Sequence, residues 1–107
     1  MVVSHDKEAP VSHSLIRMQV EDYDRFKQAF DGNAEARAAR GCKGGTVFRT
    51  MGSPNEVHIL LEWDTSKGPF EHYLLESDSM AERLREGTMV EGSLHLYLIE
   101  AAYTTPS

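Results

Sequence analysis

The sequence has few of the features that mark secreted, membrane-bound or disulfide-linked proteins. Cys42 is the only cysteine, which excludes an internal disulfide and a metal site built from several cysteines. No apolar run approaches the ~20 residues that span a bilayer. The opening MVVSHDKEAPVSH has no basic region leading into an apolar run, so it does not resemble a secretory signal. We therefore expect a cytoplasmic protein with no membrane partner.

Basic residues are also in short supply. The 11 Lys and Arg are outnumbered by 17 Asp and Glu, which gives a formal net charge of -6, and they are scattered along the chain. Proteins that bind nucleic acid concentrate Lys and Arg on one face. The composition therefore argues against a nucleic-acid partner.

The remaining composition is typical of a small folded domain, with 40% hydrophobic and 26% charged residues. A chain of 107 residues buries a full core with difficulty on its own, so oligomerisation is expected. We predict a single domain over residues 12–103, preceded by a flexible tail at 1–11 and followed by a short tail at 104–107.

Hydrophobic periodicity predicts a strand and then a helix in the first half of the chain. Residues 12–20 alternate, with one row running from Ser14 to Val20 and the other from His13 to Gln19. Apolar residues at helical spacing follow from position 23 to position 34, after a good N-cap at 22. We expect this helix to end at Gly41, with 32–33 as candidate positions for a kink.

The second half predicts two strands, a helix and a last strand. GGTVFRTM (44–51) and EVHILLEW (56–63) read as a hairpin around GSPNE (52–56), which has the composition of a turn. Helical spacing then runs from Thr65 to Gly87, and SLHLYLIEA (93–101) is the final strand. The order β-α-β-β-α-β predicts an α+β, ferredoxin-like fold, with sheet order 4-1-3-2 and both helices on one face.

One face of this sheet would lack a helical cover. The wholly apolar row of the third strand, Val57 to Trp63, should lie beneath the helices, and the row from Glu56 to Glu62 should face away. The uncovered face would also carry four large apolar side chains: Leu15, Phe48, Tyr97 and Ile99. Such a face is too apolar for water, so we predict a homodimer with the two sheets packed face to face.

Three segments carry a resemblance to a known superfamily: VEDYDRFKQAF, GCKGGTVFR and above all PNEVHILLEWD. With the order of elements they resemble the dimeric α/β-barrel superfamily, most closely its small antibiotic-biosynthesis-monooxygenase-like and cyclase-like members, over about residues 14–100. That superfamily includes polyketide cyclases, cofactor-free quinone-forming monooxygenases and haem-degrading enzymes. Fold membership therefore does not fix function.

The resemblance implies a small-molecule site between the sheet and its own helices. Its walls would be aromatic and Met-rich, suited to a flat apolar ligand, although the same side chains would equally fill a small core. The predicted lining consists of Ile16, Met18, Phe26, Phe30, Val57, Ile59, Leu61, Trp63, Phe70, Met80 and Leu84. Haem degradation is disfavoured, because the positions that match the axial histidine and the strand-one asparagine of that branch hold Leu84 and Ile16.

The chain is more similar to the plant olivetolic acid cyclase type, an aldol cyclase. That resemblance implies Tyr73 as the donor to the enolate and a histidine as base, but the catalytic histidine of that enzyme corresponds to Ser79 here. His72 is the nearest replacement, although neighbouring helical positions diverge by ~100°. The strand-three histidine of that type falls near His58, and its strand-one histidine near His13.

The histidines on the strands can be placed by parity. His58 lies five residues from Trp63, an odd offset that puts the two on opposite faces, so we interpret His58 as an interface residue in preference to a base. His58 and His95 should flank strand one, ~9.6 Å apart, with His13 at the other end of the sheet. That separation argues against a shared metal ion.

Three functions remain open. The first, which the residues favour, is a cofactor-independent enzyme that cyclises or dehydrates a polyketide-like substrate, with Tyr73 as enolate donor and His72 or His58 as base. The second is a cofactor-free monooxygenase acting on a phenolic or anthrone-type compound with Trp63 in its pocket, though Met18 and Phe26 stand where relatives often have histidine and tryptophan. The third is a non-catalytic homodimer that binds a hydrophobic, aromatic or polyketide-like compound.

Overall fold

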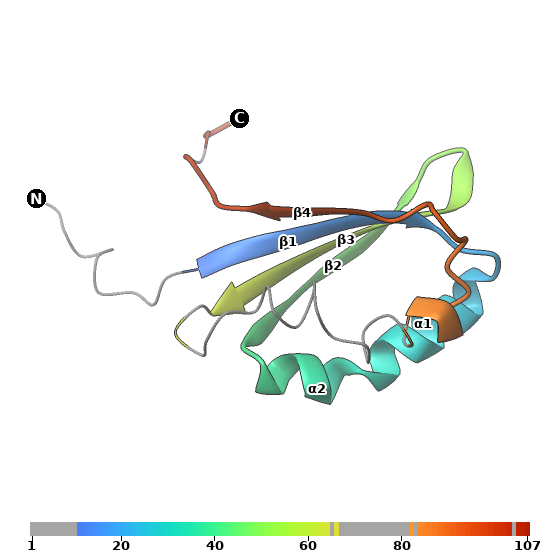
Figure 1. Ribbon diagram of the computed structural model, residues 1–107. Coiled ribbons are helices and arrows are strands. Elements are labelled where there is room, and N and C mark those ends of the chain that lie inside the picture. Colours follow the sequence, from blue (N-terminus) through green and yellow to red (C-terminus); the bar gives the residue numbers. More distant parts are fainter. Residues whose placement is uncertain (1–10, 65, 67–81, 83, 104) are drawn as a thin grey trace, which may run out of the picture.

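The computed structural model describes residues 11–64, 66, 82, 84–103 and 105–107, and its strands form one antiparallel sheet (Figure 1). The sheet has four strands in the order β2-β3-β1-β4, which confirms the predicted order 4-1-3-2 read from the other edge. The elements in chain order are β1 (Val11–Gln19), α1 (Tyr23–Gly32), α2 (Ala34–Ala39), β2 (Cys42–Thr50), β3 (Ser53–Asp64) and β4 (His95–Ile99).

The two central strands carry the core on one face. The row from Ser14 to Val20, which runs along β1 and one residue beyond it, is buried, while Arg17 and Gln19 on the other row are exposed. The apolar row of β3 is also buried, as its composition predicts, and Val57 and Trp63 are both 0% exposed. The buried hydrophobic cluster consists of Ile16, Met18, Val20, Phe26, Val57, Ile59, Leu61 and Trp63.

The first helical segment begins and breaks where the sequence predicts. Asp22 is the N-cap of α1, and its carboxylate accepts a hydrogen bond from the backbone N–H of Arg25 at 3.2 Å. The chain leaves the helix at Asn33 and enters α2, so the expected kink is a break between two helices. Gly41, at φ 101, turns the chain into β2 in a backbone region that favours glycine.

The predicted turn at 52–56 is wrong in extent. Thr50 pairs with Ser53 across a loop made of Met51 and Gly52, and β3 already begins at Ser53. Gly52 supplies the positive φ of 86 that so tight a loop needs. Asn55 stays extended because its carbonyl accepts a hydrogen bond from the Val20 N–H at 2.9 Å, which ties this part of the hairpin to the chain after β1.

Of the second predicted helix, the structure describes positions 66, 82 and 84–87. Positions 84–86 are helical, and the helix gives way to a turn at Gly87, where the sequence places its end. Thr88 then adopts φ 64, and its hydroxyl accepts a hydrogen bond from the Asp22 N–H at 3.0 Å. This contact attaches the turn to the start of α1. The final strand is shorter than the predicted 93–101, since Ser93 uses its hydroxyl to accept a hydrogen bond from the Gln19 N–H at 3.1 Å before β4 starts.

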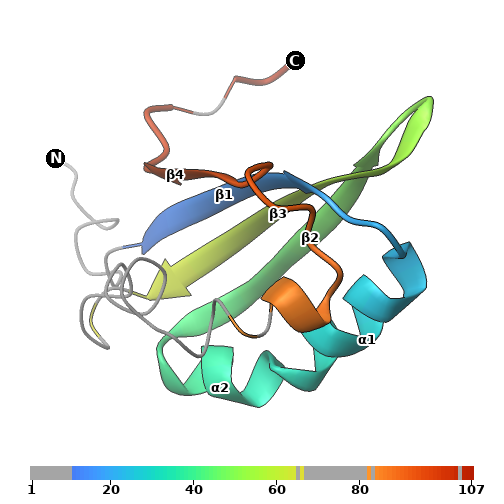
Figure 2. The ribbon, with the colours of Figure 1, turned by 45° about the vertical axis from the view of Figure 1, so that its right-hand side comes forward.

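The helices α1 and α2 lie on the same side of the sheet (Figures 1 and 2). The other side, here called the open face, carries the row of β1 that begins with His13 and the row of β3 that begins with Glu56. Phe48 and Tyr97 are 51% and 49% exposed there, and Ile99 is 41% exposed. The predicted arrangement of one covered and one uncovered face is therefore confirmed for the single chain.

Candidate functional site

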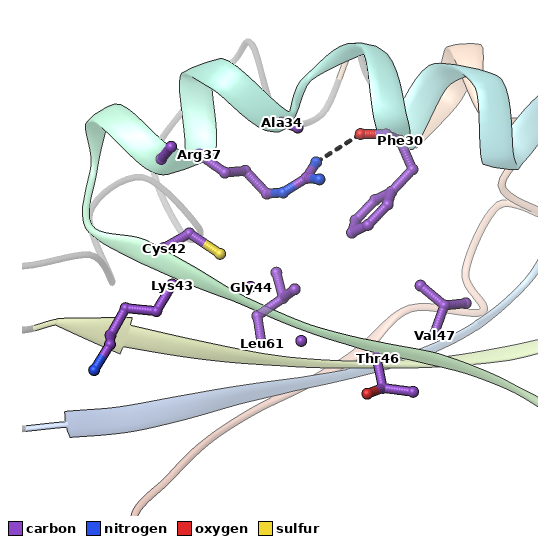
Figure 3. Close-up of a pocket in the computed structure, with 11 residues that line it drawn as sticks. Phe30, Ala34, Arg37, Cys42, Lys43, Gly44, Thr46, Val47 and Leu61 are labelled. Atoms are coloured by element: carbon purple, nitrogen blue, oxygen red, sulfur yellow. Dashed lines mark hydrogen bonds between the residues drawn. The ribbon is translucent and has the colours of Figure 1, made fainter.

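A cavity of about 340 Å³ lies between the helices and strand β2 (Figure 3). Helix residues form its roof, and the start of β2 with part of β3 forms its floor. The cavity is here called the α2–β2 cavity, and its lining consists of Phe30, Ala34, Arg37, Ala38, Cys42, Lys43, Gly44, Gly45, Thr46, Val47 and Leu61.

A β-bulge shapes the floor of the α2–β2 cavity. Cys42 pairs with Trp63 and Gly44 pairs with Glu62, so Lys43 is an extra residue on β2. Because of this extra residue, Cys42 and Val47 lie on the same helix-facing side although an odd number of positions separates them.

Glycine at position 45 is required by a close approach of two strands. A Cβ atom built on Gly45 would collide with the backbone carbonyl of Leu60. Gly44 has open space around it but a φ of 111, which side-chain-bearing residues rarely adopt. At positions 44 and 45 the floor of the cavity is therefore backbone that carries no side chain of its own.

The roof carries a positioned guanidinium. Arg37 donates a hydrogen bond from Nη1 to the Phe30 carbonyl at 2.7 Å, and its Cζ lies 3.8 Å from the centroid of the Phe30 ring. Figure 3 shows the guanidinium beneath Ala34 and beside Phe30, above Leu61 on the floor of the cavity. The Phe30 ring is itself stacked on Phe26, with centroids 5.6 Å apart. Two contacts therefore fix the cation in a half-buried position.

The other cation of the lining is directed elsewhere. Lys43 extends away from the cavity in Figure 3, and its Nζ lies 3.2 Å from Glu62 Oε2 on the open face. Its charge is thus compensated by a carboxylate. Arg37 is the lining cation that remains over the cavity.

The structure separates the predicted pocket residues into three groups. Phe30 and Leu61 line the α2–β2 cavity. Four others, Met18, Phe26, Ile59 and Trp63, are buried in the hydrophobic cluster, and half-buried Leu84 packs against it. The remaining two, Phe70 and Met80, lie outside the described residues, as do Tyr73 and His72.

Trp63 has its polar atom satisfied within the core. Its Nε1 donates a hydrogen bond to Ser14 Oγ at 2.9 Å, and both residues are 0% exposed. Ile16 and Val57, also predicted to line the pocket, are buried in the same cluster. In the described part of the chain, this tryptophan is a core residue with a matched partner.

Nine of the eleven lining residues were not predicted as site residues, among them Arg37, Cys42 and Lys43. Arg37 could have been found, because it continues the helical spacing of Phe30 and Ala34 by three further positions. Cys42 is half-buried. The β-bulge that places Cys42 on the cavity side cannot be predicted from the alternation of apolar and polar residues along a strand.

His58 lies on the open face, on the side of the sheet opposite Trp63, as the odd offset predicts. Its Nε2 is 2.8 Å from Thr50 Oγ1 and 3.8 Å from Glu56 Oε1. Thr50 donates its hydroxyl proton to Glu56 Oε1 at 2.6 Å. This hydrogen bond lowers the pKa of the Glu56 carboxyl below its ordinary value. Burial opposes it, and the nearby His58 and Arg17 lower the pKa by smaller amounts.

The other strand histidines take the places expected of them. Arg17 pairs with His58 on one side and with His95 on the other, so the two histidines flank β1. His13 lies further along β1, 4.0 Å from Glu62 Oε1, at the edge of a second hollow of about 290 Å³ on the open face. Within the described ranges, no group of three His, Cys, Asp or Glu side chains could hold a metal ion.

Solved structures with the same fold were found. SnoaB, a cofactor-independent oxygenase from Streptomyces nogalater, matches with a TM-score of 0.69 at 17% identity, over 92% of this chain and 100% of that one. A protein from Bordetella bronchiseptica named for antibiotic biosynthesis monooxygenases matches with a TM-score of 0.67 at 14% identity, over 90% and 100%. A similarly named protein from Caulobacter crescentus matches with a TM-score of 0.64 at 16% identity, over 89% and 92%.

The chain has their fold. The resemblance read from the sequence is confirmed at that level, since several of the matched structures carry the name of antibiotic biosynthesis monooxygenases. No family model matches the sequence, and no curated protein matches it either. No helix in the described part of the chain is long and apolar enough to cross a membrane.

Proposed function

We propose that the protein is a cofactor-independent, cytoplasmic enzyme that oxidises a planar phenolic or anthrone-type molecule with O₂. The observation that carries this proposal is the cavity of about 340 Å³ that lies between the helices and the sheet, walled by Phe30, Val47 and Leu61. A flat, largely apolar ligand suits such walls. The fold shared with SnoaB, a cofactor-independent oxygenase, supports this reaction class.

The proposed reaction needs no group beyond the substrate and O₂. The ionised substrate supplies the electrons, its CH₂ carbon gains one oxygen atom as a carbonyl, and the second oxygen atom leaves with the two hydrogens as water. The protein's contribution would be to hold the anion in a fixed orientation against the apolar side chains of Phe30, Val47 and Leu61.

Aldol cyclisation, which the sequence favours, stays a prediction. It depends on Tyr73 as donor and on His72 or His58 as base. Tyr73 and His72 lie outside the described residues, while His58 is on the face of the sheet that is turned away from the α2–β2 cavity. No described contact favours the cyclase over the oxygenase, so the assay below is designed to distinguish them.

We also propose that the working form is a homodimer. The open face presents Phe48, Tyr97 and Ile99 at 51%, 49% and 41% exposure, next to half-buried Leu15 and Leu60. Burying such a row against a second copy removes apolar surface from water on both chains. In a two-fold symmetric dimer the open face of one chain packs against the open face of the other, so the apolar row is buried on both chains.

Oxygen uptake in the presence of a hydroxylated anthrone tests the proposed reaction. The wild-type protein should consume one O₂ per quinone formed. Ala34→Trp, which places a large ring in the α2–β2 cavity, should abolish uptake. Ala36→Trp is the matched control, because Ala36 is on the same helix and is exposed like Ala34 but does not line the cavity.

Other outcomes of this assay would replace the proposal. Conversion of a linear poly-β-ketone thioester with no oxygen uptake would establish the cyclase instead. Saturable binding of the anthrone with neither reaction would indicate a ligand-binding protein. Equal uptake by the two tryptophan variants would remove the α2–β2 cavity from the mechanism.

A further inference from the structure

We propose that Arg37 is the specificity-determining residue of the α2–β2 cavity and that it binds an ionised oxygen, a phenolate or a carboxylate, on a planar aromatic ligand. This inference rests on the proposed function for the location of the site, and it adds the charge of the ligand and the residue that recognises it. Arg37 reaches the cavity from α2, above a floor formed by β2.

The guanidinium of Arg37 has unused capacity for hydrogen bonding. Of the five N–H donors in a guanidinium, one is given to the Phe30 carbonyl at 2.7 Å. Among the residues that the structure describes, no carboxylate forms an ion pair with Arg37. A half-buried guanidinium without a carboxylate is costly, and a ligand anion would satisfy it. A carboxylate would accept two parallel hydrogen bonds, and a phenolate would accept hydrogen bonds at its single oxygen.

The side chain is also held in place before any ligand arrives. The carbonyl and the ring of Phe30 fix the guanidinium from two directions, at 2.7 Å and 3.8 Å. A ligand would therefore immobilise little additional side chain on binding, which favours affinity. The net charge of the chain is -6, so an anion gains nothing from the protein as a whole and must be recognised locally.

A second arginine in the same chain provides a matched control. Arg49 donates from Nε to the Pro54 carbonyl at 2.7 Å and lies 3.8 Å from the centroid of the Tyr23 ring. Its contacts are therefore of the same two kinds as those of Arg37, but it does not line the cavity. Arg37→Gln and Arg49→Gln each remove one charge, one bond to a carbonyl and one ring contact, although Arg49 is exposed and Arg37 half-buried. Only the first should change the binding of ligands.

Cys42 offers a reporter that requires no turnover. It is the only cysteine of the chain, it lines the same cavity, and its side chain is half-buried. A ligand lying under Arg37 should shield its thiol. Alkylation of Cys42 by N-ethylmaleimide, followed by mass spectrometry, therefore measures occupancy of this cavity specifically.

The experiment compares a hydroxynaphthoate with its neutral carboxamide, by calorimetry and by protection of Cys42 from alkylation. The wild-type protein should bind the anion roughly 10- to 100-fold more tightly than the amide and lose reactivity at Cys42 as it binds. Arg37→Gln should lose this preference, and Arg49→Gln should keep it. Arg37→Lys should keep part of it, because lysine retains the positive charge but lacks the planar pair of N–H donors of a guanidinium.

The inference is overturned if Arg37→Gln and Arg49→Gln change the preference equally, or if the anion binds without protecting Cys42. Its failure can be told from failure of the proposed function. Anion binding through Arg37 in a protein that consumes no O₂ leaves this inference standing and removes only the oxygenase. Full oxygen uptake by Arg37→Gln, with an unchanged KM for an ionised substrate, would remove this inference and leave the oxygenase standing.

Discussion

The indole Nε1 of Trp63 donates a hydrogen bond to the hydroxyl of Ser14 at 2.9 Å, and neither residue is exposed to solvent. Ser14 is the buried polar side chain of the described core. Its burial is compatible with a stable fold because a buried hydroxyl and a buried N–H that meet each other leave neither group without a partner. The pair fastens the C-terminal half of β3 to β1.

Removing the hydroxyl should destabilise the fold. Ser14→Ala leaves the Trp63 N–H without this acceptor in a dry core, and we expect it to lower the free energy of unfolding by about 1–3 kcal/mol. Trp63→Phe removes the donor and some volume. If the two groups act as a pair, the double variant will lose less than the sum of the single losses in urea denaturation. Strict additivity of the two losses would contradict the pairing.

The strands were the most predictable part of this molecule. Alternation places Ser14 and Trp63 on the covered face and His58 on the open face, because each strand repeats every two residues whatever surrounds it. Alternation gives no information on which atoms meet, so the hydrogen bond between Ser14 and Trp63 required the register of β1 against β3. The turn at 52–56 was misread because Pro and Asn suggest a turn by composition, whereas Asn55 is held extended by its bond to Val20.

The candidate site was less predictable than the fold. Phe30 and Leu61 were expected in the lining because they are apolar and face inward. Arg37 was missed because its charge suggests a solvated helix surface, although its spacing from Phe30 and Ala34 places it on the cavity side. Cys42 depends on the bulge at Lys43, a local insertion that strict alternation cannot signal.

The contact between Thr50 and Glu56 leads to a prediction about pH. The Thr50 hydroxyl lowers the pKa of the Glu56 carboxyl, so this interaction stabilises the fold above the ordinary pKa of a glutamate and is lost as the pH falls through the lowered value. Thr50→Val should therefore raise the pKa of Glu56. The stability difference between the variant and the wild type should shrink as the pH falls through that acid range.

The carboxyl carbon shift of Glu56, followed by NMR against pH, measures this change directly. Thr46→Val is the control, since Thr46 lies on the same strand and the same face but four residues from the pair. It should leave the titration of Glu56 where it is. An unchanged Glu56 pKa in Thr50→Val would show that the hydroxyl at 2.6 Å does not hold the carboxylate in solution.

The uncovered face leads to a prediction about assembly. Leu60 lies between Thr46 and Leu15 in the register of the sheet, and Leu15 continues that row to Tyr97. In a face-to-face dimer the centre of this row would be buried on both copies, so Leu60→Glu would bring two carboxylates into one apolar contact. We expect this variant to sediment with the mass of one chain where the wild type has twice that mass.

Met51→Glu separates this effect from a general change in charge. Met51 is 97% exposed at the tip of the hairpin, beyond the paired part of the open face. Its replacement by glutamate introduces the same negative charge as Leu60→Glu. It should leave the dimer intact at the concentrations where Leu60→Glu is monomeric. A wild-type protein with the mass of a single chain at every concentration would mean that the apolar row on the open face is tolerated in water, and the proposed two-fold pair would then have to be abandoned.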